Sequence, residues 1–292
     1  GSGVFSVAGD EIIQLKNIGM VTSAAFGDLN SDGKPDLVIA GEWMPVTIFF
    51  NTNNRFRAVS QNGSSGLWQT LLLNDVNGDG FTDIVAGNWG INSKLATGKS
   101  GPLRLYVKDF DNNGVKDPVL TYSVNNKEYT FLPKDELEQV VPALKKKFLY
   151  YNEFAGKEVK DIFDISSGDN GKLEVNDLAS AIFYNDGKGN LTKMDLPMEL
   201  QLTPLFCFAK DSAGKNWFAG GNFYGVLPYE GQYDASSFMG FQLADSKITN
   251  TKVLEIKGEV RDMKWIRTAS KGDVLIVARN NDSLLFYSRA KR

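Results

Sequence analysis

The chain has 292 residues, of which 42% are apolar and 12% aromatic, enough for a packed core and too many for a disordered chain. Its 32 basic and 35 acidic residues give a formal charge of -3, which argues against a binder of nucleic acid or of anionic membranes. There is no histidine and one cysteine, Cys207, so Ser-His-Asp and Cys-His catalytic sets and an intramolecular disulfide are excluded. Cys207 lies in an apolar run and is predicted to be a buried small hydrophobe.

A short phrase recurs along the chain. Residues 36–43 and 83–89 both contain a run of β-branched and apolar residues that ends in small residues and a tryptophan, and weaker copies occupy 217–223 and 273–280. Such a run predicts a buried strand that meets a tight corner. A second phrase, at 48–56 and again at 182–191, is an apolar run followed by a polar turn, which predicts a hairpin.

The spacing of these phrases predicts the fold. Ala40 and Ala86 are 46 residues apart, and about four short strands fall within each unit. A period of this length with four strands per unit is typical of the blades of a β-propeller. We therefore expect an all-β fold, a single propeller domain over 1–292, with blade units at 17–60, 67–97 plus 178–197, 200–255 and 256–292. The last unit shows three strands, so residues 11–15 are expected to supply its fourth and close the ring.

Residues 98–177 interrupt the second unit and are expected to form an insertion. Its first part is predicted to hold strands. In its second part, four apolar residues recur at steps of four, three and four: Leu137, Val141, Leu144 and Phe148. This is helical spacing, so helices are predicted over 134–163, with Pro142 ending one and starting the next. Residues 145–147 are three lysines, expected to be a solvated face, with a basic docking patch as the alternative.

Three nine-residue loops share one pattern. Asp or Asn occupies positions 1, 3, 5 and 9, and glycine occupies position 6. The first loop offers the side chains of Asp28, Asn30, Asp32 and Asp36 and the carbonyl of Lys34. The second offers Asp75, Asn77, Asp79 and Asp83 and the carbonyl of Phe81. The third offers Asp109, Asp111, Asn113 and Asp117 and the carbonyl of Val115.

This pattern predicts calcium, with up to three ions. Alternate residues of a tight loop direct their side chains to one point, and glycine at position 6 permits the sharp turn. Every donor is an oxygen, which suits Ca²⁺ better than Mg²⁺ or Zn²⁺. The loops are not EF-hands, because position 12 is Ile39, Ala86 or Leu120 instead of glutamate. A fourth copy at 209–217 lacks oxygens at positions 1, 5 and 9, and no metal is expected there.

The phrase from Phe26 to Val38 resembles an FG-GAP/VCBS repeat, which builds the N-terminal propeller of integrin α subunits and many bacterial surface proteins. Residues 106–111, 117–118 and 144–148 are similar to longer bacterial proteins of this type. The resemblance implies structural calcium on loops between the first two strands of a blade, ligand binding on one propeller face and usually no catalysis. Integrin-like propellers have seven blades and four are counted here, so either a smaller ring or a slice of a longer protein is expected.

A ligand-binding face is predicted where the repeated phrases end. Corresponding positions of successive blades fall on one side of a propeller, so the aromatic residues at these corners are expected to gather there. The alternative is that they pack as wedges between blades. The candidates at the corners are Trp43, Asn88, Trp89, Asn222 and Phe223, and three tyrosines of the third unit, Tyr224, Tyr229 and Tyr233, are expected to be exposed.

The leading functional hypothesis is a non-catalytic, calcium-stabilised recognition or adhesion module that binds protein or glycan. One alternative is a carbohydrate lyase or glycosidase on a propeller scaffold, which would use carboxylates, lysine or tyrosine as acid and base. The other is a purely structural domain of a larger surface protein. No apolar run reaches the roughly 20 residues of a membrane-spanning helix, so no span is expected in this segment. Millimolar calcium favours an extracellular, bacterial cell-surface or periplasmic location, where further domains of a longer chain are possible partners.

Overall fold

The computed structural model describes residues 15–288 apart from 53–54, 96, 98–100, 166–170, 228–230, 236–237, 245–246, 255 and 270–271. Strands make up 47% of the chain and helices 9%, in several four-stranded antiparallel sheets. The predicted all-β, propeller-like fold with few helices is confirmed.

Four sheets follow one another along the chain, and we number them in that order. The first is β1 (Met20–Gly27), β2 (Asp36–Met44), β3 (Thr47–Thr52) and β4 (Arg55–Ser60), with the short β5 (Gly66–Leu67) paired to β2. The second is β6 (Thr70–Asn74), β7 (Asp83–Gly87), β12 (Ala181–Asn185) and β13 (Leu191–Asp195). The third is β14 (Leu205–Lys210), β15 (Asn216–Gly221), β16 (Phe238–Ala244) and β17 (Lys247–Leu254), preceded by a 3₁₀ turn at Met198–Leu200. The fourth is β18 (Val260–Thr268), β19 (Gly272–Arg279) and β20 (Leu285–Ser288).

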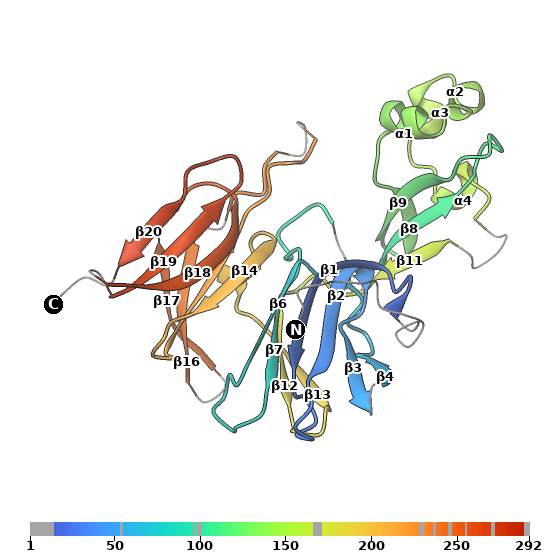
Figure 1. The fold of residues 1–292 in the computed structure, drawn as a ribbon. Coiled ribbons are helices and arrows are strands. Elements are labelled where there is room, and N and C mark those ends of the chain that lie inside the picture. Colours follow the sequence, from blue (N-terminus) through green and yellow to red (C-terminus); the bar gives the residue numbers. More distant parts are fainter. Residues whose placement is uncertain are drawn as a thin grey trace, which may run out of the picture.

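The four sheets lie in sequence order along an arc (Figure 1), with their first strands as neighbours: β1 beside β6, β6 beside β14, and β14 beside β18. Within the described residues the fourth sheet has three strands. Residues 11–14 of the segment expected to complete it lie outside the described residues. Leu15 is described, and it packs against a buried apolar cluster of the first sheet made of Leu37, Ile39, Met44 and Phe49.

A fifth sheet and four short helices form the insertion. The insertion sheet is β8 (Leu103–Lys108), β9 (Asp117–Val124), β10 (Lys127–Thr130) and β11 (Lys172–Val175), in the order β10-β9-β8-β11. The helices are α1 (Lys134–Val140), α2 (Leu144–Lys147), α3 (Tyr151–Phe154) and α4 (Val159–Ile162). They project with this sheet from one end of the arc (Figure 1). Val141, Leu144 and Phe148 are buried between helices and sheet, whereas Lys145 and Lys146 are exposed.

Apolar side chains fill the spaces between successive sheets, because each sheet buries one face against the following sheet. The core between the first two sheets includes Val38, Ile48, Trp68, Ile84 and Phe183. Trp68 is fully buried, and its indole N–H donates to the carbonyl of Ser64 at 2.8 Å. A buried polar group with its partner costs little, so this large side chain is buried without an unpaired donor.

The small residues of the repeated phrase have a packing reason. A Cβ on Gly87, the last residue of β7, would lie 2.5 Å from the carbonyl oxygen of Leu205 in β14. A Cβ on Gly220 in β15 would lie 2.5 Å from Val260 Cγ1 in β18. In both cases the neighbour is the first strand of the next sheet. Glycine at the end of the second strand therefore lets the following sheet approach closely.

Candidate metal centres

The three Asp-rich loops occupy equivalent places in three different sheets. Each joins the first two strands of its own repeat: β1 to β2, β6 to β7 and β8 to β9. Position 9 is the first residue of the second strand in every case, and these carboxylates are buried: Asp36 0% exposed, Asp83 0% and Asp117 4%. The insertion sheet thus repeats the hairpin of the first two sheets, although β11 pairs on the opposite edge of β8.

The position-9 carboxylate ties each loop to its sheet. Asp36 accepts the N–H of Leu29 at 3.0 Å and the N–H of Asn51, at the end of β3, at 2.8 Å. Asp83 accepts the N–H of Val76 at 2.9 Å and that of Asn185, in β12, at 2.8 Å. These aspartates, on the second strand of each sheet, therefore bind the loop before them and the third strand through main-chain hydrogen bonds, a role that the metal pattern alone did not predict.

Burial and neighbouring charge both act on Asp83. Desolvation raises the pKa of this carboxyl, and the carboxylates of Asp79 and Asp75 raise it further, against the hydrogen bonds from Asn185 and Val76. A cation held among the three carboxylates would act in the opposite direction. The second loop thus concentrates negative charge at a partly buried point.

Position 1 of each loop holds the turn at position 6. Asp28 accepts the N–H of Gly33 at 2.9 Å, and Asp75 accepts the N–H of Gly80 at 3.0 Å. Asp109 accepts the N–H of Gly114 at 2.8 Å. The three glycines have φ angles of 79°, 90° and 88°, the left-handed region that side chains with a Cβ rarely adopt. The prediction that position 6 must be glycine for backbone reasons agrees with these angles.

Residue 7 follows that glycine with its side chain in solvent. Lys34 is exposed, Phe81 is 36% exposed and Val115 is 64% exposed. Their side chains therefore lie outside the loop interior, which is what we expect of a residue that offers only its carbonyl oxygen to a cation.

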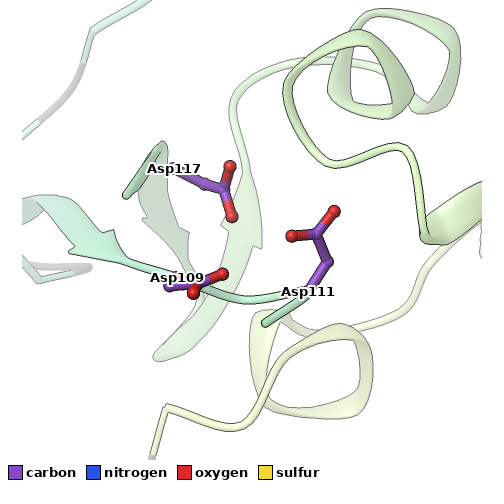
Figure 2. A group of neighbouring side chains, drawn as sticks. All are labelled: Asp109, Asp111 and Asp117. Carbon is purple, nitrogen blue, oxygen red and sulfur yellow. The ribbon is translucent and has the colours of Figure 1, made fainter. Parts of the chain in front are cut away.

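The third loop brings its carboxylates closest together. Oxygens of Asp109, Asp111 and Asp117 all lie within 4.8 Å of one another, and Figure 2 shows the three side chains grouped around one space. Asp111 Oδ1 is buried and has no hydrogen-bond partner among the described residues. A buried acceptor without a donor is costly, and a hard divalent cation would satisfy it. The donor set, all oxygen, fits calcium.

The first two loops differ from the third at positions 3 and 5, where they have asparagine and then aspartate. Asn30 Nδ2 donates to Asp32 at 3.2 Å, and Asn77 Nδ2 donates to Asp79 at 2.8 Å. In these loops the asparagine amide partly offsets the carboxylate at position 5. The third loop has aspartate at position 3 and asparagine at position 5, so its three charges converge without such a contact.

In the fourth copy of the loop, Asp211 is 5% exposed and accepts the N–H of Lys215 at 2.9 Å. Its second oxygen accepts from Asn216 Nδ2 at 2.6 Å. This carboxylate holds the β14–β15 hairpin together.

The aromatic corners of the second and third sheets meet each other. The rings of Trp89 and Phe223 are 5.3 Å apart, and those of Trp89 and Tyr233 are 5.9 Å apart. The guanidinium of Arg261 lies 4.0 Å above the ring of Phe206, beside this group.

Tyr233 is 9% exposed, so the expectation that it is exposed was wrong, because its ring packs on Trp89 and its main chain pairs with Phe223 through two hydrogen bonds. Tyr224 and Trp43 are partly buried, and Tyr229 lies outside the described residues.

The two asparagines of the predicted face are inside the molecule. Asn88 is 0% exposed; its Oδ1 accepts the N–H of Leu67 at 3.0 Å and its Nδ2 donates to the carbonyl of Asp177 at 3.0 Å. Asn222 is 4% exposed and donates to the carbonyl of Gly258 at 3.1 Å. Both amides bond the main chain, which leaves Trp43, Trp89, Phe223 and Tyr224 as the partly exposed members of this set.

One comparison with known proteins matches the part of the chain that contains the first two loops. The family model of the FG-GAP-like repeat matches residues 28–86, which begin at position 1 of the first loop and run to β7. The expected resemblance to the FG-GAP-like repeat family is confirmed over these residues. Repeats of this family form recognition or adhesion modules, are generally non-catalytic, usually mediate protein interactions and are typical of extracellular or surface proteins.

Two further comparisons add less. No curated protein matches the sequence. Among solved structures, one described as "Crystal structure of BBS1N in complex with ARL6DN, soaked with lead" is 11% identical, with 92% of this chain and 80% of that chain covered. Its TM-score of 0.23 is too low for an argument about fold. None of the helices in the described part of the chain has the length and hydropathy to span a bilayer.

Proposed function

We propose that this chain is a calcium-stabilised recognition or adhesion module of a surface or secreted protein, in an extracellular, cell-surface or periplasmic location. The observation that carries the proposal is the third loop, where three carboxylates converge and Asp111 Oδ1 is a buried acceptor without a donor. Bound calcium would supply the positive charge that this cluster lacks. The first two loops share the spacing and the left-handed glycine, and so are the second and third candidate sites.

Calcium in such loops would act on stability. In each loop the position-1 carboxylate holds the turn and the position-9 carboxylate begins the second strand, so a cation between these groups would hold the hairpin closed. Binding to the folded state alone adds RT ln(1 + [L]/Kd) to the free energy of unfolding. Extracellular modules of this kind have Kd values of about 10⁻⁴–10⁻³ M, so millimolar calcium would occupy the sites. A melting temperature that neither EDTA nor added Ca²⁺ changes would contradict this role.

The proposed ligand face contains Trp43, Trp89, Phe223 and Tyr224. Trp43 supports this choice, because it has a φ angle of 60°, a conformation that costs a bulky residue roughly 1–3 kcal/mol. Such strain concentrates at functional positions. A glycan array and a pull-down with the full chain test the proposal, with Trp43→Ala expected to weaken capture of the protein or glycan ligand. Equal capture by the wild type and this variant would remove Trp43 from the ligand face.

A further inference from the structure

A cavity lined by charged and apolar side chains lies between the insertion sheet and α4, apart from the three loops and from the aromatic corners. Its volume is about 310 Å³, at the small end of the range for ligand pockets. Its walls include Arg104, Ser123, Glu128, Glu158, Val159 and Lys160. These residues come from β8, from β9 and β10, and from the first turn of α4, so three separate segments build one space.

The wall on the sheet side is a fixed ionic network. Arg104 Nη1 lies 3.0 Å from Glu128 Oε2, and Arg104 Nε lies 2.9 Å from Glu174 Oε1. Glu128 also accepts from the hydroxyls of Tyr106, at 3.3 Å, and Thr121. The Arg104 and Glu128 side chains are only 24% and 16% exposed. Among the described residues, the hydrogen bonds of Arg104 to carboxylates use Nε and Nη1, so Nη2 can donate to a ligand that reaches it.

The wall on the helix side carries a second ion pair. Lys160 Nζ lies 2.9 Å from Glu158 Oε2, and the Lys160 side chain is 63% exposed, at the rim. Val159 between them is 1% exposed and gives this wall an apolar part, as do Pro102 and Ile165. The cavity therefore combines two ion pairs with an apolar surface that is the larger part of its lining, as the faces of a sugar ring require.

The charges restrict the ligand. Two cations and two anions line the cavity, and each cation is already paired with a carboxylate on its own wall. A charged ligand would have to compete with one of these pairs. A neutral molecule with several hydroxyl groups donates to carboxylates and accepts from Arg104 at the same time, without breaking either pair. The volume limits it to a compact ring or two.

We propose that this cavity binds a neutral saccharide unit, either as a free sugar or as the terminal residue of a glycan. The inference deepens the proposed recognition function, on which it rests, by giving a ligand class and a place on the insertion. It is separate from the Trp43 face and needs no metal ion in its own chemistry.

Saturation-transfer NMR with the full chain in calcium buffer tests the proposal. The probes are glucose, galactose, mannose and N-acetylglucosamine, their disaccharides, and glucuronate as the charged comparison. We expect transfer to at least one neutral sugar with a Kd below about 1 mM, and weaker transfer to glucuronate. Stronger binding of disaccharides than of single sugars would identify a glycan end as the source. Absence of binding by every neutral sugar would overturn the proposal.

Variants locate the binding. Arg104→Lys keeps the charge but loses the planar fork, so we expect at least a tenfold loss of sugar affinity. Lys160→Ala, at the exposed rim, is a second variant that should fold normally and also weaken binding. The matched control is Arg267→Lys, an 82% exposed residue of β18 that should leave affinity unchanged. If sugar binds equally well to both pocket variants, this cavity is not the site, although the recognition function would stand; a glycan array and pull-down without any ligand would contradict that function itself.

Discussion

Asn185, at the end of β12 in the second sheet, donates a hydrogen bond from Nδ2 to the main-chain carbonyl of Leu29 at 2.8 Å. Leu29 is position 2 of the first Asp-rich loop and is fully buried. One asparagine thus connects the hairpin of the second sheet to the candidate metal loop of the first. The same amide also donates to the carbonyl of Thr82 at 3.0 Å, next to the position-9 residue of the second loop.

Asn185→Ala should destabilise the protein. Asn185 is 3% exposed, and its Oδ1 accepts the N–H groups of Gly187 and Gly189 in addition to the two bonds that Nδ2 donates. Removing the amide leaves buried main-chain groups unpaired, at about 1–3 kcal/mol for each that finds no water. We expect a loss of about 2–4 kcal/mol in urea unfolding, since some of these groups will rehydrate.

The control is Asn51→Ala, the equivalent residue of the first sheet. Its Nδ2 donates to the carbonyl of Pro35 at 3.2 Å in an exposed setting, so water can replace the bond. We expect a smaller loss than for Asn185→Ala. Equal losses in the two variants would show that the link between the sheets adds no stability.

Gly87→Ala should loosen the packing of the third sheet on the second. The new Cβ would lie 2.5 Å from the Leu205 carbonyl, a main-chain atom that moves only with β14. We expect a loss of about 1–3 kcal/mol in the free energy of unfolding, as for other overpacked sites. Gly27→Ala is the matched control, because its nearest neighbour is the end of a flexible side chain, Leu73 Cδ1 at 2.9 Å. If both variants are equally stable, close approach is not the reason for glycine at position 87.

The sequence predicted whatever is local to one repeat. The alternation of apolar runs and turns predicted the all-β fold, and the spacing of oxygens and glycine in 28–36 predicted the loop geometry around Gly33. Both depend on neighbours within a few residues. The third strands of the first two sheets share an asparagine in the sequence, Asn51 near the end of β3 and Asn185 at the end of β12. This recurrence was the available signal for the link just described.

Contacts between repeats were not predictable in the same way. Asn185 and Leu29 are 156 residues apart, and only the placement of one sheet against the next brings them together. The same holds for Asn88, because an amide after a strand does not reveal whether it faces solvent or, as here, the main chain of Leu67. The network around Arg104 depends on the side of β8 to which β11 attaches, which no local pattern specifies.

Glu174→Gln should reduce stability at neutral pH and have less effect in acid. The hydrogen bond from Arg104 holds the pKa of Glu174 below its ordinary value of 4.5. The folded protein then binds fewer protons than the unfolded chain just below pH 4.5, so this contribution is present above that pH and is lost as the pH falls through the lower, folded pKa. The side chain is 33% exposed, so we expect a loss of at most about 1 kcal/mol at pH 7.

Urea unfolding of the wild type and Glu174→Gln at pH 7 and pH 3 measures this difference. The difference in the free energy of unfolding between the two proteins should be smaller at pH 3 than at pH 7. Glu199→Gln, an exposed residue of the 3₁₀ turn, is the control and should show little difference at either pH. A gap that widens in acid would have the wrong sign for a carboxyl with a lowered pKa.

Asp111→Asn should have opposite effects with and without calcium. Without calcium the variant should be at least as stable as the wild type, because it removes one of three converging charges and introduces a donor. With calcium at 100 times Kd, an occupied site adds about 2.7 kcal/mol, and the variant should lose an amount of that order from its calcium-dependent gain. Asp186→Asn, in the exposed β12–β13 turn, makes the same change outside the three loops and should keep the full gain. Thermal melts of the wild type and of the two variants, each in EDTA and in Ca²⁺, give six melting temperatures. A calcium-dependent gain in Asp111→Asn as large as that in Asp186→Asn would mean that the third loop holds no calcium.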